Sequence, residues 1–282
     1  MIINIQTNCI SCKSKNIESS PAVLMPFISH RVFNWKPIKI NKNWKLKTIK
    51  NGMAFSLVNT LSCKNCGMLF LDIRFNESQM DRLYNGYRDH KYNELREKYE
   101  PGYIERDKLI KEGASYLKQK EKFILRNIQE RAIKKFKILD YGGDDGTNTP
   151  FKKFENIKIF DLNKKYNEIK NKLVKFDLII CSHVIEHASS PEKLISKIKK
   201  LMKKNSYLYI EVPFEKIVYD SHPKMPDPSK KKHWHEHINF FTKKSLLYLF
   251  SNAGLKIIDE KVSKEYAHGN FPAFWKFLLK LT

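Results

Sequence analysis

The feature that most constrains the fold is an alternation of strand-like and helix-like runs along residues 136–262. Four apolar runs have the length and composition of buried strands: FKILDYG, IKIFDLN, FDLIICSH and SYLYIEVPF. Between the last two, SPEKLISKIKKLMKKN predicts an amphipathic helix that begins after Ser190. TKKSLLYLFSNAG predicts a further helix that ends at Gly254, before a fifth strand. Apolar strands separated by helices predict an α/β fold with a parallel sheet.

Two C-x-x-C pairs precede this region, with Cys9 and Cys12 in CISC and Cys63 and Cys66 in CKNCG. Each pair directs two sulfur atoms to one point, and two pairs supply the four tetrahedral ligands that Zn²⁺ prefers. Four protein ligands leave no position for a reacting water, so this zinc would be structural. Two independent reduced pairs, or a redox motif, are the alternatives. The pattern predicts a small module similar to a zinc ribbon.

Residues 76–135 are charged and have helical patterning. Asn76 or Ser78 is suited to cap the first helix. EPGY interrupts the pattern, and a second, longer helix is expected from Ile104 to about Ile133. The expected organisation is therefore a zinc-binding module over 1–75, a helical lid or linker over 76–135 and the α/β domain over 136–282.

The net charge of +23 favours anionic partners such as nucleotides, nucleic acid, acidic glycans or a lipid surface. Only eight of the 53 basic residues are Arg, however, and sites that read phosphate favour the bidentate fork of Arg. The alternative explanation of the net charge is a general enrichment of the chain in lysine, without any anionic partner. The sequence has no signal-peptide pattern and no apolar run near the roughly 18 residues of a membrane span. Cysteine pairs that are suited to bind a metal, and not to form a secreted disulfide framework, favour a cytoplasmic protein.

The turn DYGGDDG follows the first predicted strand of the α/β domain. Glycines at this place let the chain turn sharply and bring backbone N–H groups to a ligand, which lies outside the carboxyl ends of the strands. The next strand ends at Asp161, where a ribose diol would find a carboxylate acceptor. By itself the turn also fits any glycine-rich connection between a strand and a helix.

The order of a strand, DYGGDDG, a strand ending in Asp and then FDLIICSHVIEH resembles the class I S-adenosylmethionine-dependent methyltransferases over about residues 136–262. The resemblance implies a Rossmann-like domain and S-adenosyl-L-methionine as the cofactor. By this resemblance, the cofactor loop consists of Asp140, Gly142, Gly143 and Gly146. The acid that binds the ribose is Asp161, and the methionine end lies against Ser182 and His183. Asp144 departs from the family, which usually has its middle glycine there. About a dozen residues separate IFDLN from FDLII, so the sheet is expected to be shortened at one edge.

The segment KKHWHEHINFFT concentrates His233, His235, Glu236 and His237. A metal cluster and histidines that only cap a helix are two alternatives. The segment also resembles the HEH signature of zinc-containing sugar methyltransferases that act on nucleotide-linked keto sugars, and these share the four-cysteine module. The resemblance implies that His237 is the general base and that Glu236 is its partner or a substrate ligand. In HVIEH, the EH pair is expected to order its loop.

The run LYNGYRDHKYNELREKYEPGY holds residues suited to a sugar ring or a phosphate: Tyr84, Tyr87, Arg88, Tyr92, Arg96 and Tyr103. A helical face with tyrosines in the core is the alternative. The residues expected to bind substrate are Tyr87, Arg88, Tyr92 and His235. The final run FPAFWKFLLKLT is expected to dock onto the domain rather than on a membrane. It ends where the similar sugar enzymes continue into another domain, so methyl transfer to oxygen is expected over transfer to carbon.

These features together predict a zinc-containing, S-adenosylmethionine-dependent methyltransferase. Its expected acceptor is a sugar, nucleotide-sugar or related small molecule in surface polysaccharide biosynthesis, and this substrate class comes from the resemblance alone. One alternative is an RNA or protein methyltransferase that docks through the zinc module and the basic surface, although the few Arg residues argue against a nucleic-acid partner. Another is a non-catalytic binding module that lost the cofactor because of Asp144.

Overall fold

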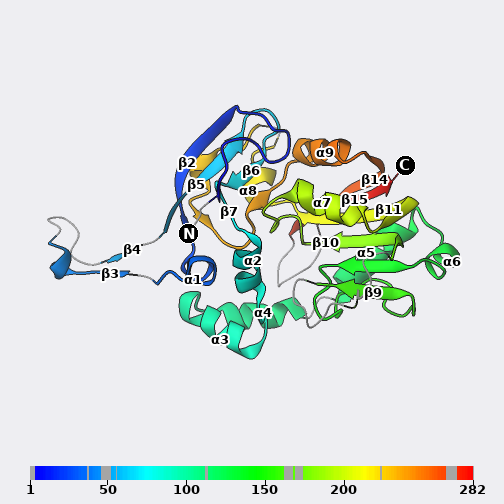
Figure 1. Cartoon of the computed structure of the whole chain (residues 1–282), viewed down its shortest axis with the longest axis horizontal. Coiled ribbons are helices and arrows are strands. Elements are labelled where there is room, and N and C mark those ends of the chain that lie inside the picture. The colour runs from blue at the N-terminus through cyan, green and yellow to red at the C-terminus, as the bar shows by residue number, and fades with distance from the viewer. Residues whose placement is uncertain are drawn as a thin grey trace.

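The computed structural model describes residues 4–36, 38–45, 52–54, 56–111, 114–161, 168, 174–222, 224–264 and 272–281. Two sheets dominate these residues and lie side by side, with a group of helices below the junction between them (Figure 1). One sheet is built mainly from the N-terminal part of the chain and the other from the C-terminal part.

The larger sheet has six strands in the order β14-β15-β11-β10-β8-β9. Their bounds are β8 (Ile138–Tyr141), β9 (Ile157–Phe160), β10 (Phe176–Ser182), β11 (Met202–Pro213), β14 (Leu255–Lys264) and β15 (Ala273–Leu281). Strands β9, β8, β10 and β11 are parallel neighbours, whereas β15 runs antiparallel to β11 and β14. The carboxyl ends of the four parallel strands therefore meet at one edge of the sheet.

The sequence-based fold class is confirmed: the domain is a Rossmann-like α/β fold, and each predicted apolar run forms a strand. In the part of the chain that the structure describes, no strand pairs beyond β9, in line with a sheet shortened at that edge. The predicted parallel sheet has one antiparallel strand, β15. The terminal run docks as predicted, but it does so as β15, an interior antiparallel strand whose Phe277, Leu278 and Leu279 are fully buried.

Helices cover both faces of this sheet. On one face, α5 (Ala114–Leu125) and α6 (Glu130–Ile133) pack on side chains such as Leu178 and Ile180. On the other face, α7 (Pro191–Lys199) and α9 (Lys243–Asn252) pack on Ile179 and Cys181, because successive strand residues point to opposite faces. The side chains of Ser190 and Thr242 cap α7 and α9. Helix α7 ends earlier than the sequence pattern suggested, because Met202 already begins β11.

A helical group precedes the sheet and consists of α2 (Glu77–Tyr84), α3 (His90–Tyr99) and α4 (Tyr103–Lys111). Of the two predicted caps it is Asn76 that closes α2, in a capping box with Gln79. The predicted break at EPGY separates α3 from α4. The long helix expected from Ile104 to about Ile133 was wrong in its last part, because α5 ends at Leu125 and α6 is a separate short helix. Residues 112–113, between α4 and α5, lie outside the described part.

The second sheet has five strands in the order β12-β2-β5-β6-β13. Its members are β2 (Ile17–Leu24), β5 (Ser56–Cys63), β6 (Leu69–Leu71), β12 (His233–Trp234) and β13 (Asn239–Phe240). Both edge strands thus come from the histidine segment, which crosses from one edge of the N-terminal sheet to the other. The indole Nε1 of Trp234 donates to Thr60 Oγ1 at 2.7 Å, and Arg74 Nη2 donates to Asn239 Oδ1 at 2.7 Å. The cysteine module therefore fixes the position of residues 235–238.

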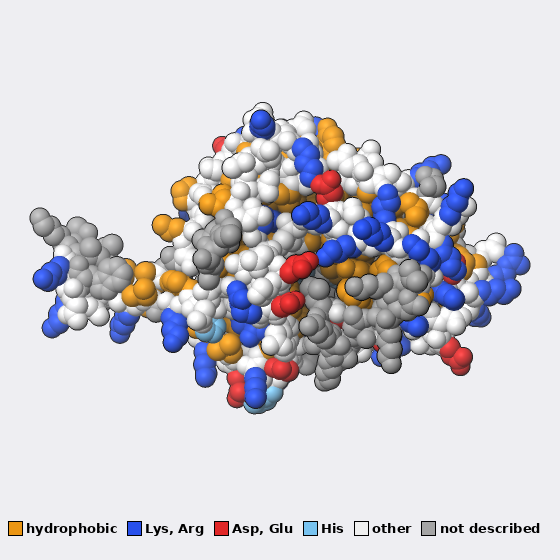
Figure 2. All heavy atoms as spheres, in the orientation of Figure 1, with side chains coloured by type: hydrophobic (Ala, Val, Ile, Leu, Met, Phe, Trp, Pro, Cys, Tyr) orange, Lys and Arg blue, Asp and Glu red, His pale blue; other side chains and the backbone are white. Residues whose placement is uncertain are grey.

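Smaller elements complete the described chain: α1 (Pro26–Phe33), η1 (Lys42–Trp44), α8 (Lys216–Tyr219), η3 (Pro228–Lys230) and the strand pairs β1 (Asn4–Ile5) with β7 (Ile73–Arg74) and β3 (Ile38–Ile40) with β4 (Gly52–Ala54). The β3–β4 hairpin projects from the body (Figure 1). Lys and Arg side chains are spread over the visible face, from this hairpin to the larger sheet, rather than gathered in one patch (Figure 2). Among the described helices, none has the length and hydropathy needed to cross a bilayer.

Candidate active site

The four cysteines of the N-terminal module converge on one point. Sγ of Cys9 lies 3.6 Å from Sγ of Cys66, and Sγ of Cys12 lies 3.5 Å from Sγ of Cys63. All four sulfur atoms lie within 4.8 Å of one another. A tetrahedral zinc with Zn–S bonds of about 2.3 Å needs sulfur atoms about 3.8 Å apart. The cluster therefore has the donor set and the size that structural Zn²⁺ requires.

The glycine turn after β8 depends on two residues with positive φ. Gly142 has φ +85° and Gly146 has φ +76°, and a Cβ at either position would lie 2.4 Å from a side-chain atom of Val184 or Ile159, respectively. Asp144 also has positive φ, at +50°. Aspartate enters this left-handed region more readily than most residues. The turn therefore keeps a glycine-like backbone at the position where the sequence departs from the family.

A cavity of about 180 Å³ opens beside this turn, and we call it the glycine-loop cavity. Gly142, Asp144 and Asp161 line it on one side, at the carboxyl ends of β8 and β9. Asp161 Oδ2 accepts a hydrogen bond from the backbone N of Asp144 at 3.0 Å. Burial, followed by the nearby Asp161 carboxylate, raises the pKa of Asp144 to about 6. Anionic ligand groups are therefore disfavoured here, and hydroxyl or cationic groups are favoured.

The other predicted cofactor residues lie near the same cavity, but its lining does not include Asp140, Gly143, Gly146 or Ser182. His183 lines it, whereas Ser182 lies behind, donating to Glu211 Oε1 at 2.9 Å. Asp140 is buried beneath the turn and accepts from Thr149 Oγ1 at 2.6 Å; burial raises its pKa to about 6. A Cβ at Gly143 would lie 2.8 Å from Asp140 Oδ2, so this glycine lets the turn pack on the acid. The predicted residues are thus together in space.

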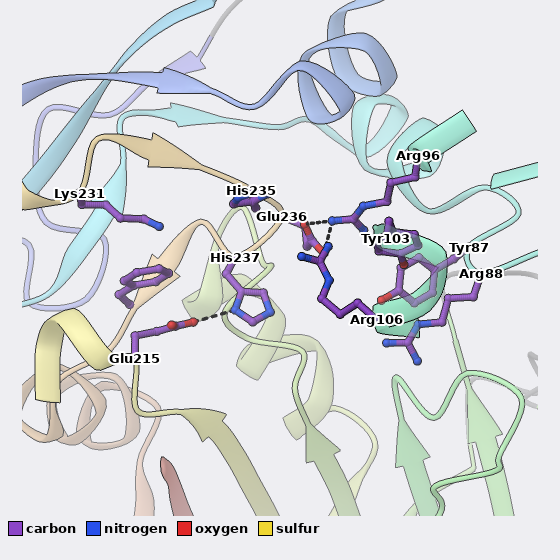
Figure 3. A pocket seen from close by; sticks show the side chains of 11 residues that line it. Tyr87, Arg88, Arg96, Tyr103, Arg106, Glu215, Lys231, His235, Glu236 and His237 are labelled. Carbon is purple, nitrogen blue, oxygen red and sulfur yellow. Dashed lines mark hydrogen bonds and ion pairs between the residues drawn. The ribbon is translucent and has the colours of Figure 1, made fainter. Parts of the chain in front are cut away.

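A second cavity, of about 260 Å³, lies over the histidine segment, and we call it the histidine cavity (Figure 3). Glu215 and Lys231 lie on one side of it and Arg96 and Arg106 on the other, with His237 between them (Figure 3). Glu215 lies at the carboxyl end of β11, since it follows directly after the EVPF run.

His237 is held by Glu215. Its Nδ1 lies 2.8 Å from Glu215 Oε1, and a carboxylate only accepts, so Nδ1 donates and Nε2 is left for another partner. Burial opposes the charged ring, but the hydrogen bond to Glu215 prevails and raises the pKa of His237 to about 9. Glu215 was not among the site residues predicted from the sequence, in which its only signal is its place just after a predicted strand.

Glu236, the partner expected for His237, instead pairs with Arg96. Arg96 Nη2 donates to both carboxylate oxygens of Glu236, at 3.0 and 2.8 Å, and its guanidinium stacks over Tyr103 at 4.1 Å. Burial opposes the charged carboxylate of Glu236, but Arg96 outweighs it and lowers the pKa to about 2. Arg96 also binds Glu100 and is 2% exposed. It therefore anchors the histidine segment, and its charge is already compensated.

The two cavities meet at a pair of histidines. His187 lines the glycine-loop cavity and His237 lines the histidine cavity. Their rings are 4.6 Å apart, edge to face, and Tyr87 lines both cavities. The ring nitrogen Nδ1 of His187 lies 3.0 Å from the backbone O of Glu236. A group bound in one cavity therefore has a short route to the other.

The expected substrate-binding residues divide into two groups. Tyr87, Arg88 and His235 line the histidine cavity. Tyr92 lines neither cavity: it is 3% exposed and packs against Phe27 with ring centroids 5.1 Å apart, so its place is in the core. Arg96 and Tyr103, which the sequence offered for a sugar ring or a phosphate, also line this cavity. Its lining further includes residues that the sequence did not single out: Arg106, Lys231 and Phe240.

Comparison with known proteins adds the following. A search of the curated proteins gave no significant match. Among solved structures, 1,6-didemethyltoxoflavin-N1-methyltransferase of Burkholderia thailandensis is 14% identical, with 68% of this chain and 90% of that chain covered and a TM-score of 0.46. Magnesium protoporphyrin IX methyltransferase of Synechocystis is 10% identical, with 60% and 82% covered and a TM-score of 0.42. N-methyltransferase NodS of Bradyrhizobium japonicum is 10% identical, with 59% and 97% covered and a TM-score of 0.36.

A family model described as a methyltransferase domain matches residues 86–260, more than half of the 282-residue chain. The matched region contains the glycine turn, the parallel strands that end at it, and the histidine segment. The chain therefore belongs to the methyltransferase-domain family, and methyl transfer from S-adenosylmethionine is the class of activity expected of it.

Proposed function

We propose that the protein transfers a methyl group from S-adenosylmethionine, bound in the glycine-loop cavity, to an acceptor bound in the histidine cavity. The observation that carries the proposal is the meeting of the two cavities at His187 and His237, whose rings are 4.6 Å apart. Methyl transfer needs the donor carbon and the acceptor atom in line and in contact, which two adjoining cavities permit.

In the glycine-loop cavity, the ribose and the methionine end of the cofactor have suitable partners. The Asp161 carboxylate would accept from the ribose hydroxyls, and the turn with Asp140, Gly142, Gly143 and Gly146 would leave room for the nucleoside. Ser182 and His183 would lie at the methionine end. The Asp144 carboxylate, next to Asp161, suits the positively charged amino or sulfonium group better than the carboxylate of the cofactor.

In the histidine cavity, charge and aromatic rings favour a phosphate-bearing sugar. Arg88, Arg106 and Lys231 supply positive charge, and Tyr87 and Tyr103 supply faces for a sugar ring. Arg106 is 55% exposed on its side chain, with Glu100 3.5 Å away, so it can turn to a ligand. These residues support a sugar, a nucleotide-sugar or a related small acceptor, as expected from the sequence. Its place in the synthesis of a surface polysaccharide is proposed from the resemblance alone.

We propose a hydroxyl as the acceptor group. Its oxygen attacks the methyl carbon, the new C–O bond forms as the C–S bond of the sulfonium breaks, and S-adenosylhomocysteine leaves. The hydroxyl proton passes to Nε2 of His237, since Nδ1 is occupied by Glu215. Because Glu215 raises the pKa of His237 to about 9, the neutral ring that acts as the base becomes more populated as the pH rises toward 9. Glu236 keeps His237 in place through the backbone of the segment and the ion pair with Arg96.

Calorimetry tests the cofactor assignment. Both S-adenosylmethionine and S-adenosylhomocysteine are expected to bind, and Asp161→Ala to weaken both about 10-fold or more, because charge-assisted hydrogen bonds to the ribose are lost. Asp145→Ala, which removes an exposed acid of the same loop, is the matched control and keeps wild-type affinity. No heat from either compound at millimolar concentration would overturn the proposal and favour a binding module without cofactor.

The acceptor class is tested with uridine diphosphate and uridine as probes. Thermal-shift titration is expected to show stabilisation by the diphosphate and not by the nucleoside, since the Arg and Lys side chains of the histidine cavity recognise phosphate. Arg106→Gln should weaken the diphosphate about 10-fold, whereas Arg131→Gln, an exposed residue of α6, should not. Equal binding of both probes contradicts the phosphate assignment and leaves the cofactor assignment standing.

A further inference from the structure

Glu186, His187 and His237 form a second cluster of metal-ligating groups, separate from the four cysteines. One ligand atom from each residue can be chosen so that all three lie within 4.8 Å of one another. The cluster sits where the two cavities meet, since His187 lines one and His237 lines the other. Two imidazoles and one carboxylate are a ligand set that binds divalent cations on one face and leaves the other positions open.

Both imidazoles are oriented by hydrogen bonds at Nδ1. The backbone O of Glu236 can only accept, so Nδ1 of His187 donates to it at 3.0 Å and Nε2 carries the lone pair. Nδ1 of His237 donates to Glu215 Oε1 at 2.8 Å, which leaves Nε2 as the atom that can bind a cation once it has lost its proton. A carbonyl or carboxylate behind the ring is the usual support of a metal-binding histidine, because it fixes the tautomer and raises ligand basicity.

The carboxylate of Glu186 lacks hydrogen bonds. Its side chain is 1% exposed, and neither Oε1 nor Oε2 accepts a hydrogen bond from any described residue. His183 Nδ1 and His187 Nε2 instead form ion-pair contacts with Oε1, at 3.4 and 4.0 Å. The backbone is well fixed, because the O of Glu186 accepts from the N of Ile238 and of Asn239. Both ion-pair partners of the carboxylate are imidazoles, which compensate a buried carboxylate only when they are protonated, whereas a divalent cation would compensate it whether or not they are.

We infer that Glu186, His187 and His237 bind a divalent cation between the cofactor and the acceptor. Mn²⁺ and Mg²⁺ suit the carboxylate, and Mn²⁺ also tolerates imidazole, so we take Mn²⁺ as the probe. The inference rests on the proposed function for what occupies the open positions: the acceptor hydroxyl would bind the cation there, next to the methyl group. The cation would hold the oxygen and lower its pKa. His237 is then a cation ligand in place of the general base expected from the sequence.

Electron paramagnetic resonance of Mn²⁺ tests this inference with the zinc-loaded, full-length protein. The loss of the free Mn²⁺ signal on adding protein is expected to correspond to about one bound ion per chain. Glu186→Gln is expected to weaken Mn²⁺ binding on the order of 10- to 100-fold or more, because an anionic ligand is lost. His237→Gln, at a half-buried position that tolerates change more easily, should do the same. His233→Gln, a histidine of the same segment outside the cluster, is the matched control and should bind Mn²⁺ as the wild type does.

Absence of Mn²⁺ binding, or equal binding by wild type, Glu186→Gln and His237→Gln, would overturn the cation site. The calorimetric titration with S-adenosylmethionine separates this result from failure of the proposed function. Cofactor binding without Mn²⁺ binding rejects the cation and leaves His237 as the activating base. Mn²⁺ binding without cofactor binding rejects the proposed function and leaves the metal site.

Discussion

Replacing His237 by alanine is expected to slow methyl transfer on the order of 100-fold or more, while the affinity for S-adenosylmethionine stays at the wild-type value. The ring presents Nε2 at the acceptor side because Glu215 holds Nδ1, so alanine removes the group that activates the hydroxyl. Cofactor affinity is retained because His237 does not line the glycine-loop cavity. Turnover is measured as release of S-adenosylhomocysteine with a saturating acceptor, and affinity by calorimetry.

The matched control is His233→Ala, which removes an exposed histidine four positions away on β12 and should keep both turnover and affinity. A variant at His237 with unchanged turnover would remove the residue from the chemistry in either role, base or cation ligand. Loss of cofactor affinity at His237→Ala would show instead that the two cavities do not divide cofactor from acceptor. The turnover assay decides the first outcome, and the calorimetric titration decides the second.

Stripping the metal from the four-cysteine cluster is expected to unfold the N-terminal sheet and to abolish turnover. Binding of structural zinc contributes free energy of the order of 10 kcal/mol to the folding of small modules. The histidine segment pairs with both edges of this sheet: β12 pairs with β2 and β13 pairs with β6. Loss of the sheet therefore displaces residues 235–238, although the cysteines lie far from them in the sequence. Cofactor binding should survive, because the glycine turn belongs to the other sheet.

Metal analysis and hydrogen exchange check this expectation. Freshly purified protein should contain one zinc per chain, and Cys63→Ser should lose zinc together with amide protection in β5, β12 and β13. Cys181→Ala removes a thiol of β10 outside the cluster and should keep the zinc. Zinc-free purified protein, or full protection of β12 and β13 in Cys63→Ser, would contradict a structural role of the metal.

Local patterns in the sequence were enough for the Rossmann-like part. Strand positions follow from apolar runs, and the starts of α2 and α7 follow from Asn76 and Ser190. The glycine turn follows from glycines whose positive φ other residues rarely adopt. Such features depend on neighbours within a few positions, so sequence reading reaches them. The long helix expected over residues 104–133 failed because charged helical patterning does not reveal where a helix is interrupted.

The partners of charged side chains depended on contacts far apart in the sequence. From the sequence, Glu236 was expected to be the partner of His237 or a substrate ligand. Its carboxylate binds Arg96, 140 positions away, and His237 binds Glu215, 22 positions away. Tyr92 looked like a ligand for substrate and is a core residue. Adjacent residues of an extended segment point to opposite sides, so adjacency in sequence does not predict which side chains meet.

By itself, the sequence determined the α/β fold class, the cysteine set, the cofactor turn and the residues of the histidine segment, because each is a property of residue types at short spacing. Only the tertiary structure decided that the cysteine sheet takes its two edge strands from the histidine segment, that two cavities meet at His187 and His237, and that Glu186 is buried between imidazoles. These arrangements arise when sheets pack and remote strands pair, and the free energy of such contacts comes from residues that no local pattern connects.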